Sequence, residues 1–309
     1  MLKRIRRLFG REGSAVAAPD PPPPDPLPPD PAPPDPPPPY CVEHDGRVVA
    51  ALGAEGLEFS RRLEAVQRVE PDGFYEAFDA LALATPNESQ REYGLMHRRR
   101  FYELVNLAAE IVAGLEAPVM LDIGLTEYVR LYKMFIPGLS LHTLEQPNYF
   151  NPAGLGVDQP HEADLTRRAS RDAASIPKGT FDLIIFAEVL EHLFVNPVEV
   201  LEWLLALLKP SGRLLITTPN MFSKIAWPAF LNYDNPLAPF PNEEFRTLGQ
   251  AHLREYSHIE LLRFVEQAGG KSKALFFSAC WDDDETLAPI DRHNMILLAA
   301  PREAPRAAP

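Results

Sequence analysis

The stretch FDLIIFAEVLEHL, residues 181–193, decides the expected fold. Its first half, Phe181–Phe186, is a short apolar run with the length of a buried strand, and the residues that follow have helical spacing. Comparable apolar runs alternate with helical stretches from Ala117 onward; they are Val119–Ile123, Leu139–Leu144, Arg213–Thr217, Leu275–Phe277 and Met295–Ala299. Strands separated by helices predict an α/β domain in which a mostly parallel sheet has helices on both faces. In such sheets ligands bind beyond the carboxyl ends of the strands, near the point where the strand order reverses.

The second half of this stretch carries three ionisable side chains. On a helix of 3.6 residues per turn, Glu188, Glu191 and His192 share one face. The opposite face is apolar and is expected to be buried; it consists of Val189, Leu190, Leu193 and Phe194. The polar face is therefore expected to point toward the cleft at the carboxyl edge of the sheet.

Residues 41–115 are expected to form a helical cap that leads into the main domain, residues 116–300. The cap has three helical stretches, Leu57–Val69, Phe74–Ala84 and Tyr93–Leu115. The run Arg98-Arg99-Arg100 lies in the third stretch and is either a solvated face or a site for an anionic group. Later helices are predicted at Val198–Leu208 and Ile259–Ala268, and the second ends at Gly269-Gly270.

Proline is concentrated near the start of the chain. Of 34 prolines in 309 residues, 15 lie between Pro19 and Pro39, with an aspartate every five residues. Because proline fixes φ and disfavours the α conformation of the residue before it, residues 19–40 are predicted to form a polyproline II spacer. The spacer is either a semi-rigid tether or a docking site for a proline-recognising module. It follows a basic leader, residues 1–18; the Pro-rich leader region and a tail, residues 301–309, are expected to be disordered.

Charge and cysteine content limit the partners and the compartment. The net charge is −13, but residues 1–11 carry +5 and the rest of the chain −18, which argues against nucleic acid as a partner. Residues 1–11 place apolar side chains on one side of a helix and cations on the other. They are either a solvated leader or a weak peripheral contact with the inner face of the membrane. Two cysteines fit a reducing compartment, and no window of 18 apolar residues exists, so we expect a cytoplasmic protein.

The segment Asp122-Ile123-Gly124-Leu125-Thr126-Glu127-Tyr128 follows the first predicted strand. It resembles the first motif of class I S-adenosylmethionine-dependent methyltransferases, in which an acid and an apolar residue precede a Gly-x-Gly-x-Gly-like turn. Asp122 and Gly124 match that motif, whereas Thr126 and Tyr128 stand where the later glycines usually occur. Those glycines let the backbone approach the cofactor without a Cβ in the way.

Later segments resemble the same family in the same order. Glu145 closes the second strand, where a carboxylate can accept hydrogen bonds from both ribose hydroxyls, and Asp164 stands at the adenine-contacting position. Three further segments resemble consecutive parts of the family. Residues 181–193 resemble its fourth strand and the helix that follows, and residues 207–220 its next helix and fifth strand. Residues 252–270 resemble the segment after the fifth strand. The resemblance, over about residues 117–300, implies an α/β, Rossmann-like, doubly wound, mostly parallel seven-stranded sheet. It also implies S-adenosyl-L-methionine as cofactor; the expected cofactor-binding residues are Asp122, Gly124, Glu145, Asp164, Leu165 and Glu188.

Three roles compete for the polar residues after the fourth strand. His192 and His252 are the expected catalytic residues, and His192 could act as general base for a hydroxyl or amine. The alternative is a divalent metal held by Glu188, Glu191 and His192, with His252 as a further ligand, since this Glu-x-x-Glu-His arrangement resembles that of some metal-dependent relatives. In the third role these residues are structural: an acid at a helix start is stabilised by the helix dipole, and the histidine is hydrogen-bonded to a loop. We expect no metal.

Residues 219–256 are rich in aromatic residues and interrupted by prolines, which predicts a lid over the strand ends. The expected function is a methyltransferase (EC 2.1.1.-) that acts on a small-molecule or carrier-linked acceptor, by O- or N-methylation rather than C-methylation. The alternative, motivated by the missing glycines, is a catalytically inactive methyltransferase-like binding or scaffold module displayed on the proline spacer. The oligomeric state is not predicted.

Overall fold

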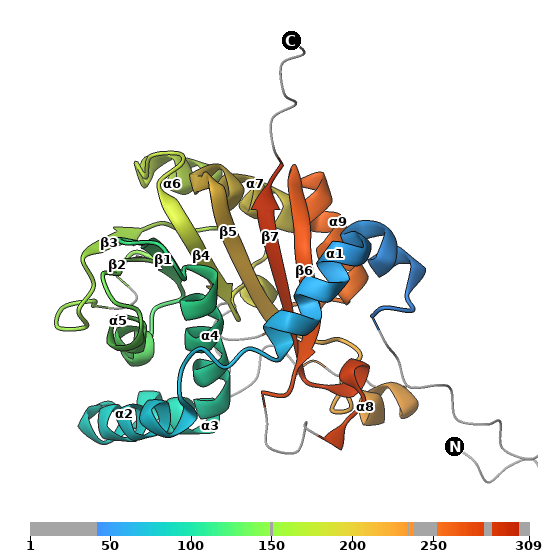
Figure 1. The fold of residues 1–309 in the computed structure, drawn as a ribbon, viewed down its shortest axis with the longest axis horizontal. Helices are drawn as coiled ribbons and strands as arrows, with labels where there is room; N and C mark the ends of the chain where they lie inside the picture. The colour runs from blue at the N-terminus through green and yellow to red at the C-terminus, as the bar shows by residue number, and fades with distance from the viewer. Residues whose placement is uncertain are drawn as a thin grey trace, which may run out of the picture. The chain divides into compact units, whose positions relative to one another are not determined.

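The computed structural model describes residues 42–148, 151–233, 235, 237, 252–280 and 286–302. Its core is a seven-stranded sheet with the order β3-β2-β1-β4-β5-β7-β6 (Figure 1). The strands are β1 (Val119–Ile123), β2 (Ser140–Glu145), β3 (Gln159–Glu162), β4 (Phe181–Ala187), β5 (Leu208–Pro219), β6 (Gly270–Ser278) and β7 (Asn294–Pro301). Neighbouring strands pair in parallel except β7, which is antiparallel to β5 and β6. The predicted Rossmann-like, mostly parallel seven-stranded fold is confirmed.

Helices cover both faces of the sheet. One face packs against α7 (Pro197–Leu207) and α9 (His258–Gln267), and the other against α2 (Pro71–Ala84), α4 (Arg98–Ile111) and α5 (Arg130–Phe135). Side chains of a strand alternate between faces, so Leu121 and Ile123 of β1 join the first cluster and Met120 joins the second. A short helix, α6 (Arg168–Ala173), follows β3.

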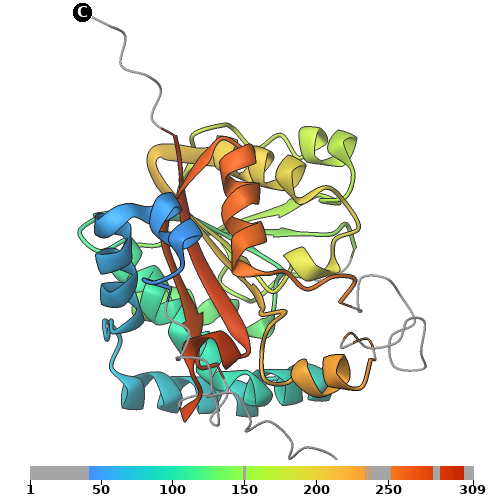
Figure 2. The same ribbon diagram turned by 90° about the vertical axis from the view of Figure 1, so that its right-hand side faces the viewer.

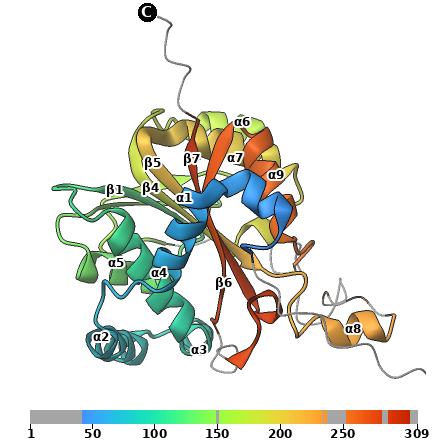
Figure 3. The ribbon, with the colours of Figure 1, turned by 45° about the vertical axis from the view of Figure 1, so that its right-hand side comes forward.

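The first helix, α1 (Gly46–Glu64), lies along the sheet at β6 (Figure 3). It bends at Gly53, which has φ 67. The backbone N–H of Leu275 in β6 donates to the Ser60 hydroxyl at 3.0 Å, and a Cβ on Gly56 would come within 3.1 Å of the Lys273 carbonyl. The helix therefore packs closely against β6. It ends at Glu64, five residues before the end of the predicted helix Leu57–Val69.

The predicted helix Tyr93–Leu115 is wrong as a single element. The structure has α3 (Glu88–Met96) and α4 (Arg98–Ile111), which meet at His97, a residue with non-helical backbone angles (φ −105, ψ 17). This break changes the direction of the chain. It brings Tyr93 of α3 and Arg100 of α4 to the same place beside the sheet.

The parallel strands point toward α2, α3 and α8 (Trp227–Leu231), which lie beyond their carboxyl ends in both views (Figures 1 and 2). Asn220, just after β5, forms a bridge with Tyr256 and so joins the two ends of the predicted aromatic lid. The central part of that lid lies outside the described residues. So do the basic leader, all of the proline spacer and most of the tail.

Among the residues described, no helix combines the length and the apolar character that crossing a bilayer requires. Cys280 is buried and is not in a disulfide. The other cysteine, Cys41, lies outside the described residues.

Candidate active site

A cavity of about 80 Å³ lies where the carboxyl ends of β1 and β4 meet. Strand β1 pairs with β2 on one side and β4 on the other, so the strand order reverses direction at this point. Crevices at such reversals are the usual ligand sites of open parallel sheets. The lining comes from two sources: Asp122, Ile123, Gly124, Thr126, Tyr128, Val129, Tyr132, Ala187, Glu188 and Val189 from the sheet domain, and Tyr93, Arg100, Phe101, Leu104 and Val105 from α3 and α4.

Asp122 and Glu145 lie at the ends of adjacent strands. Asp122 is buried and accepts a hydrogen bond from the Tyr132 hydroxyl; burial and the nearby Glu145 raise its pKa well above the usual value. Burial also raises the pKa of Glu145, although two backbone N–H groups oppose the shift. These belong to Leu125, at 3.0 Å from Oε2, and Gln146, at 2.6 Å from Oε1. Glu145 thus fixes the loop after β1 to the end of β2.

The loop after β1 needs glycine at one position and not at the others. Gly124 has φ 91, and a Cβ there would lie 2.9 Å from Val189 Cγ2. Tyr128, where the motif usually has glycine, is 1% exposed and stacks on Phe78 of α2 at 4.7 Å between ring centroids. Its ring also lies 2.0 Å from where a Cβ on Gly94 would stand. Tyr128 therefore attaches the loop after β1 to α2 and α3. At this position the loop uses a buried tyrosine side chain in place of the glycine of the motif.

Asp164 and Leu165 follow β3, next to the end of β2. The backbone N–H of Ala163 donates to the Glu145 carbonyl at 2.9 Å, which places this segment beside the Glu145 loop. One carboxylate oxygen of Asp164 accepts from the N–H and hydroxyl of Thr166, at 2.9 and 2.6 Å. The other oxygen pairs with Nε of Arg167 at 3.2 Å, and the Asp164 side chain is 27% exposed. Leu165 is buried.

Glu188 does not lie on a helix, so the predicted shared face of Glu188, Glu191 and His192 is wrong. Its φ is 54, a left-handed conformation that is strained for a residue with a side chain, and only Leu190–His192 form one 3₁₀ turn. The strand end turns sharply here instead of continuing into a helix. Phe194, expected on the buried face, is 82% exposed for the same reason, while Leu190 and Leu193 are buried as expected.

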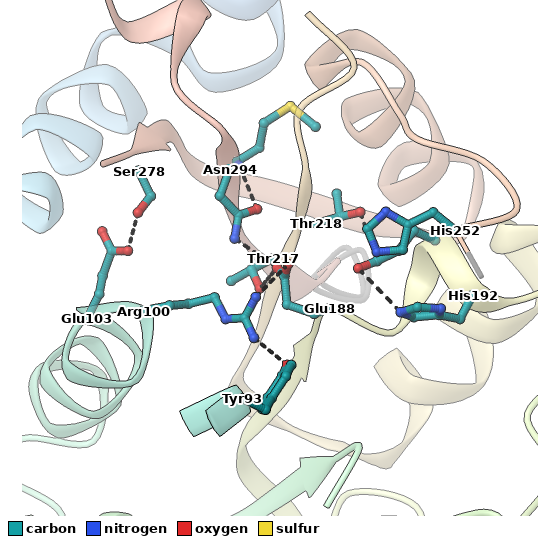
Figure 4. Close-up of polar contacts among 12 residues, drawn as sticks. Tyr93, Arg100, Glu103, Glu188, His192, Thr217, Thr218, His252, Ser278 and Asn294 are labelled. Atoms are coloured by element: carbon teal, nitrogen blue, oxygen red, sulfur yellow. Dashed lines mark hydrogen bonds and ion pairs between the residues drawn. The ribbon is translucent and has the colours of Figure 1, made fainter. Parts of the chain in front are cut away.

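The Glu188 carboxylate is instead held by three groups from distant parts of the chain (Figure 4). Arg100 donates at 3.1 Å, the Thr217 hydroxyl at 2.7 Å and the Asn294 amide at 2.8 Å. Burial alone would raise its pKa, but the charge of Arg100 and these hydrogen bonds lower it. Glu188 is therefore a buried, ionised carboxylate that lines the cavity.

The sequence interpretation left the role of Arg98-Arg99-Arg100 open, and the structure divides the run. Arg98 pairs with Asp79 near the surface, at 3.1 Å. Arg100 has a side chain only 8% exposed and pairs with Glu188, and its guanidinium also donates to the Tyr93 hydroxyl. Arg100 and Tyr93 were missed as site residues because their approach to the cavity depends on the break at His97. The arginine run was the only signal of them in the sequence.

A second polar cluster lies next to this site and contains Glu191, His192 and His252 (Figure 4). The His192 and His252 rings are 4.9 Å apart between centroids in an edge-to-face arrangement. His252 comes from a segment far along the chain, held there because the N–H of Leu253 donates to the Glu191 carbonyl at 2.8 Å. The two predicted catalytic histidines are thus brought together, outside the lining of the 80 Å³ cavity.

Residues 127–269 match a family model described as a methyltransferase domain. Solved structures with a similar fold include a complex of the Haloferax volcanii Trm112 methyltransferase activator with a methyltransferase, at 13% identity over 73% of this chain and 98% of that chain, with a TM-score of 0.46. S-adenosylmethionine-dependent methyltransferases from Mesorhizobium loti (13% identity, 64% and 96% covered, TM-score 0.45) and Archaeoglobus fulgidus (16% identity, 67% and 97% covered, TM-score 0.46) are also similar. No curated protein sequence matches the chain.

Residues 127–269 are therefore similar to the methyltransferase-domain family. The resemblance to class I methyltransferases expected from the sequence motifs is confirmed for this part of the chain.

Proposed function

We propose that the protein is an S-adenosyl-L-methionine-dependent methyltransferase with a small-molecule or carrier-linked acceptor. The observation that carries this proposal is the set of acidic side chains at consecutive strand ends, Asp122, Glu145 and Asp164, around the point where the strand order reverses. S-adenosylmethionine supplies a methyl group on a positively charged sulfur, which an acceptor oxygen or nitrogen can attack. The protein has to bind both molecules, align them and remove water.

The nucleoside end of the cofactor fits the groups between β1 and β3. A carboxylate at Glu145 can accept hydrogen bonds from vicinal hydroxyls. Asp164 can accept from an amino group once the exposed Arg167 side chain, now paired with its Oδ2 at 3.2 Å, moves aside. Gly124 keeps the intervening loop free of a Cβ where the backbone must pass close to a ligand. Leu165 adds apolar surface beside Asp164.

The amino-acid end requires a change in the helical cap. A cavity of about 80 Å³ is too small for a whole nucleoside joined to an amino acid, and Tyr93 and Arg100 occupy its cap side. Arg100 and Glu188 are opposite charges of the kind that complement the carboxylate and ammonium groups of an amino acid. Entry of the cofactor would separate this pair, so that Arg100 meets the carboxylate and Glu188 the ammonium group.

His192 and His252 are the proposed acceptor-side residues. His192 lies next to Glu191 in the turn after β4, and its side chain is 25% exposed. His252 is held beside it by the hydrogen bond from Leu253 to Glu191, and its side chain is 37% exposed. A neutral imidazole there can take the proton that an acceptor hydroxyl or amine loses when it is methylated. This supports O- or N-methylation over C-methylation.

The inactive scaffold remains the competing proposal, because Thr126 and Tyr128 replace two glycines. Glu145 and Asp164 stand at the positions expected for cofactor-binding acids, which favours the enzyme, although each also holds a loop in place. Cofactor binding by the purified full-length protein separates the two functions.

The binding test uses calorimetric titration with S-adenosylhomocysteine, the product form of the cofactor. We expect saturable binding, and a loss of at least about tenfold in affinity in Glu145→Ala, because a charged hydrogen bond to a ligand contributes about 1.5–3 kcal/mol. Glu162→Ala is the matched control, since Glu162 pairs with Glu145 across β2 and β3 but is exposed. Absence of binding at millimolar ligand by the folded protein would reject the proposed function.

A further inference from the structure

Two buried glutamates three residues apart differ in how their charge is balanced. Glu188 is paired with the guanidinium of Arg100. Glu191 is 0% exposed, and its Oε2 accepts a hydrogen bond from the Thr218 hydroxyl at 3.0 Å. Its Oε1 has no hydrogen-bond partner in the described structure. A buried carboxylate in this state is costly unless it is protonated or meets a cation.

The partnerless oxygen of Glu191 faces two imidazoles. Oε1 lies 4.0 Å from Nε2 of His192, and one ligand atom from each of Glu191, His192 and His252 lies within 4.8 Å of the others. A carboxylate oxygen and two imidazole nitrogens on one side of a small space are a common set of ligands for divalent metals. The glutamate is buried and the two histidines are partly exposed, so an ion could enter from the histidine side.

The neighbouring Glu255 determines which ring nitrogen of His252 can bind a metal ion. Its Nδ1 lies 3.2 Å from a carboxylate oxygen of Glu255. A histidine that donates one ring N–H to a carboxylate presents its other nitrogen, here Nε2, as a ligand, and this outer pairing is typical of metal-binding histidines. Thr218 orients Glu191 in the same way, by donating to the oxygen that does not face the histidines.

We propose that Glu191, His192 and His252 form a binding site for one divalent first-row transition ion, such as Zn²⁺ or Co²⁺. Two imidazoles and one carboxylate favour these ions over Mg²⁺ and Ca²⁺, which prefer oxygen ligands. This set differs from the expected alternative, Glu188, Glu191 and His192 with His252 as a further ligand, only in leaving out Glu188. Arg100, Thr217 and Asn294 engage the Glu188 carboxylate. Ligands about 2.1 Å from a tetrahedral ion lie roughly 3.4 Å apart, so the side chains must close by about 1 Å on binding.

An ion at this position would also define the class of acceptor. A bound ion would occupy the imidazole nitrogens and so replace the general-base role of His192 and His252. Its remaining coordination positions could take an acceptor oxygen and lower the pKa of its hydroxyl. This consequence rests on the proposed methyltransferase function. The metal site itself does not, since it can be measured without cofactor or acceptor.

The test uses full-length protein freed of metal with a chelator and titrated with Co²⁺, with calorimetry for stoichiometry and visible absorption for coordination. We expect one ion per chain and a d–d absorption spectrum typical of Co²⁺ with a low coordination number. Zn²⁺ should displace Co²⁺, whereas Mg²⁺ at the same concentration should not. His252→Ala and Glu191→Gln should abolish saturable binding, and Glu255→Gln should weaken it about 10- to 100-fold. His142→Ala is the matched control, because His142 and His161 form a histidine pair elsewhere, with ring nitrogens 3.1 Å apart.

Metal-free Glu191→Gln should melt no lower than the metal-free wild type, because glutamine has nearly the same size and its amide oxygen can still accept the hydrogen bond from Thr218. This result separates loss of a ligand from loss of the fold. The proposal is overturned if the wild type shows no saturable Co²⁺ binding, if Glu191→Gln and His252→Ala bind as tightly as the wild type, or if Mg²⁺ displaces Co²⁺ at equal concentration. Cofactor binding by the same samples reports on the proposed function separately.

Discussion

The Arg100–Glu188 ion pair links the helical cap to the carboxyl end of β4. Both side chains are about nine-tenths buried, and the two residues are 88 positions apart in sequence. Removing one member of a buried pair typically costs about 3–5 kcal/mol, because the other charge is left uncompensated. The pair therefore matters for stability as well as for the proposed binding of the cofactor.

We predict that Arg100→Met lowers the free energy of unfolding by about 3–5 kcal/mol, measured by urea denaturation. The double variant Arg100→Met with Glu188→Gln should recover most of this loss, since it leaves no buried charge. Arg98→Met, in the same arginine run but near the surface, is the control and should change stability by less than about 1 kcal/mol. A double variant no more stable than Arg100→Met would contradict this account of the pair.

Sequence motifs located some residues of the candidate site and missed others. Asp122, Gly124 and Glu188 line the cavity as expected, because a strand end fixes where they lie whatever the rest of the chain does. Arg100, Tyr93 and Asn294 come from other elements, and no local pattern shows which strand end they reach. The turn at Glu188 was also missed, because its left-handed backbone is imposed by the buried contacts of its carboxylate and not by its residue type.

At the scale of elements, the sequence predicted the buried strands of the sheet. Five of the six predicted apolar runs lie wholly in strands of the sheet, and the sixth begins one residue before β2. Strands β5 and β6 each start five residues before the predicted run. Strand β3, with the sequence Gln-Pro-His-Glu, was not among them, because it lies at the sheet edge and three of its four side chains are exposed. Edge strands do not need the apolar pattern that reveals central ones.

Glu103 links α4 to the end of β6, where the Ser278 hydroxyl donates to its carboxylate. Burial raises the pKa of Glu103 from 4.5 to about 7, and the hydrogen bond from Ser278 opposes this only in part. The folded state therefore holds the proton more tightly than the unfolded chain does. The stabilisation is fully present below about pH 4.5 and is lost as the pH rises to about 7.

We predict that Glu103→Gln, which cannot ionise, gains stability relative to the wild type as the pH rises. The difference in free energy of unfolding should grow by about 2 kcal/mol between about pH 5 and about pH 8. Urea denaturation at several pH values measures it, with Glu76→Gln on the exposed face of α2 as control. A difference that stays constant over this range would show that Glu103 is ionised in the folded protein.

At the scale of the whole molecule, the helical cap both completes and closes the candidate active site. Tyr128 stacks on Phe78 of α2, and Arg100 and Tyr93 fill the side of the cavity next to α3 and α4. The same contacts that stabilise the cap thus occupy part of the space that the proposed cofactor needs. Binding of the proposed cofactor would require these side chains to move.

The central claim is that the groups around β1, β2 and β3 hold S-adenosylmethionine and that the cap opens for it. A crystal structure of the full-length protein with S-adenosylhomocysteine tests this most directly. We expect the ribose hydroxyls at Glu145, the adenine beside Asp164 and Leu165, and Arg100 moved from Glu188 to the ligand carboxylate. Crystals grown with millimolar ligand that show the Arg100–Glu188 pair intact, with Tyr93 and Arg100 still in the cavity and no ligand at Glu145, would contradict it.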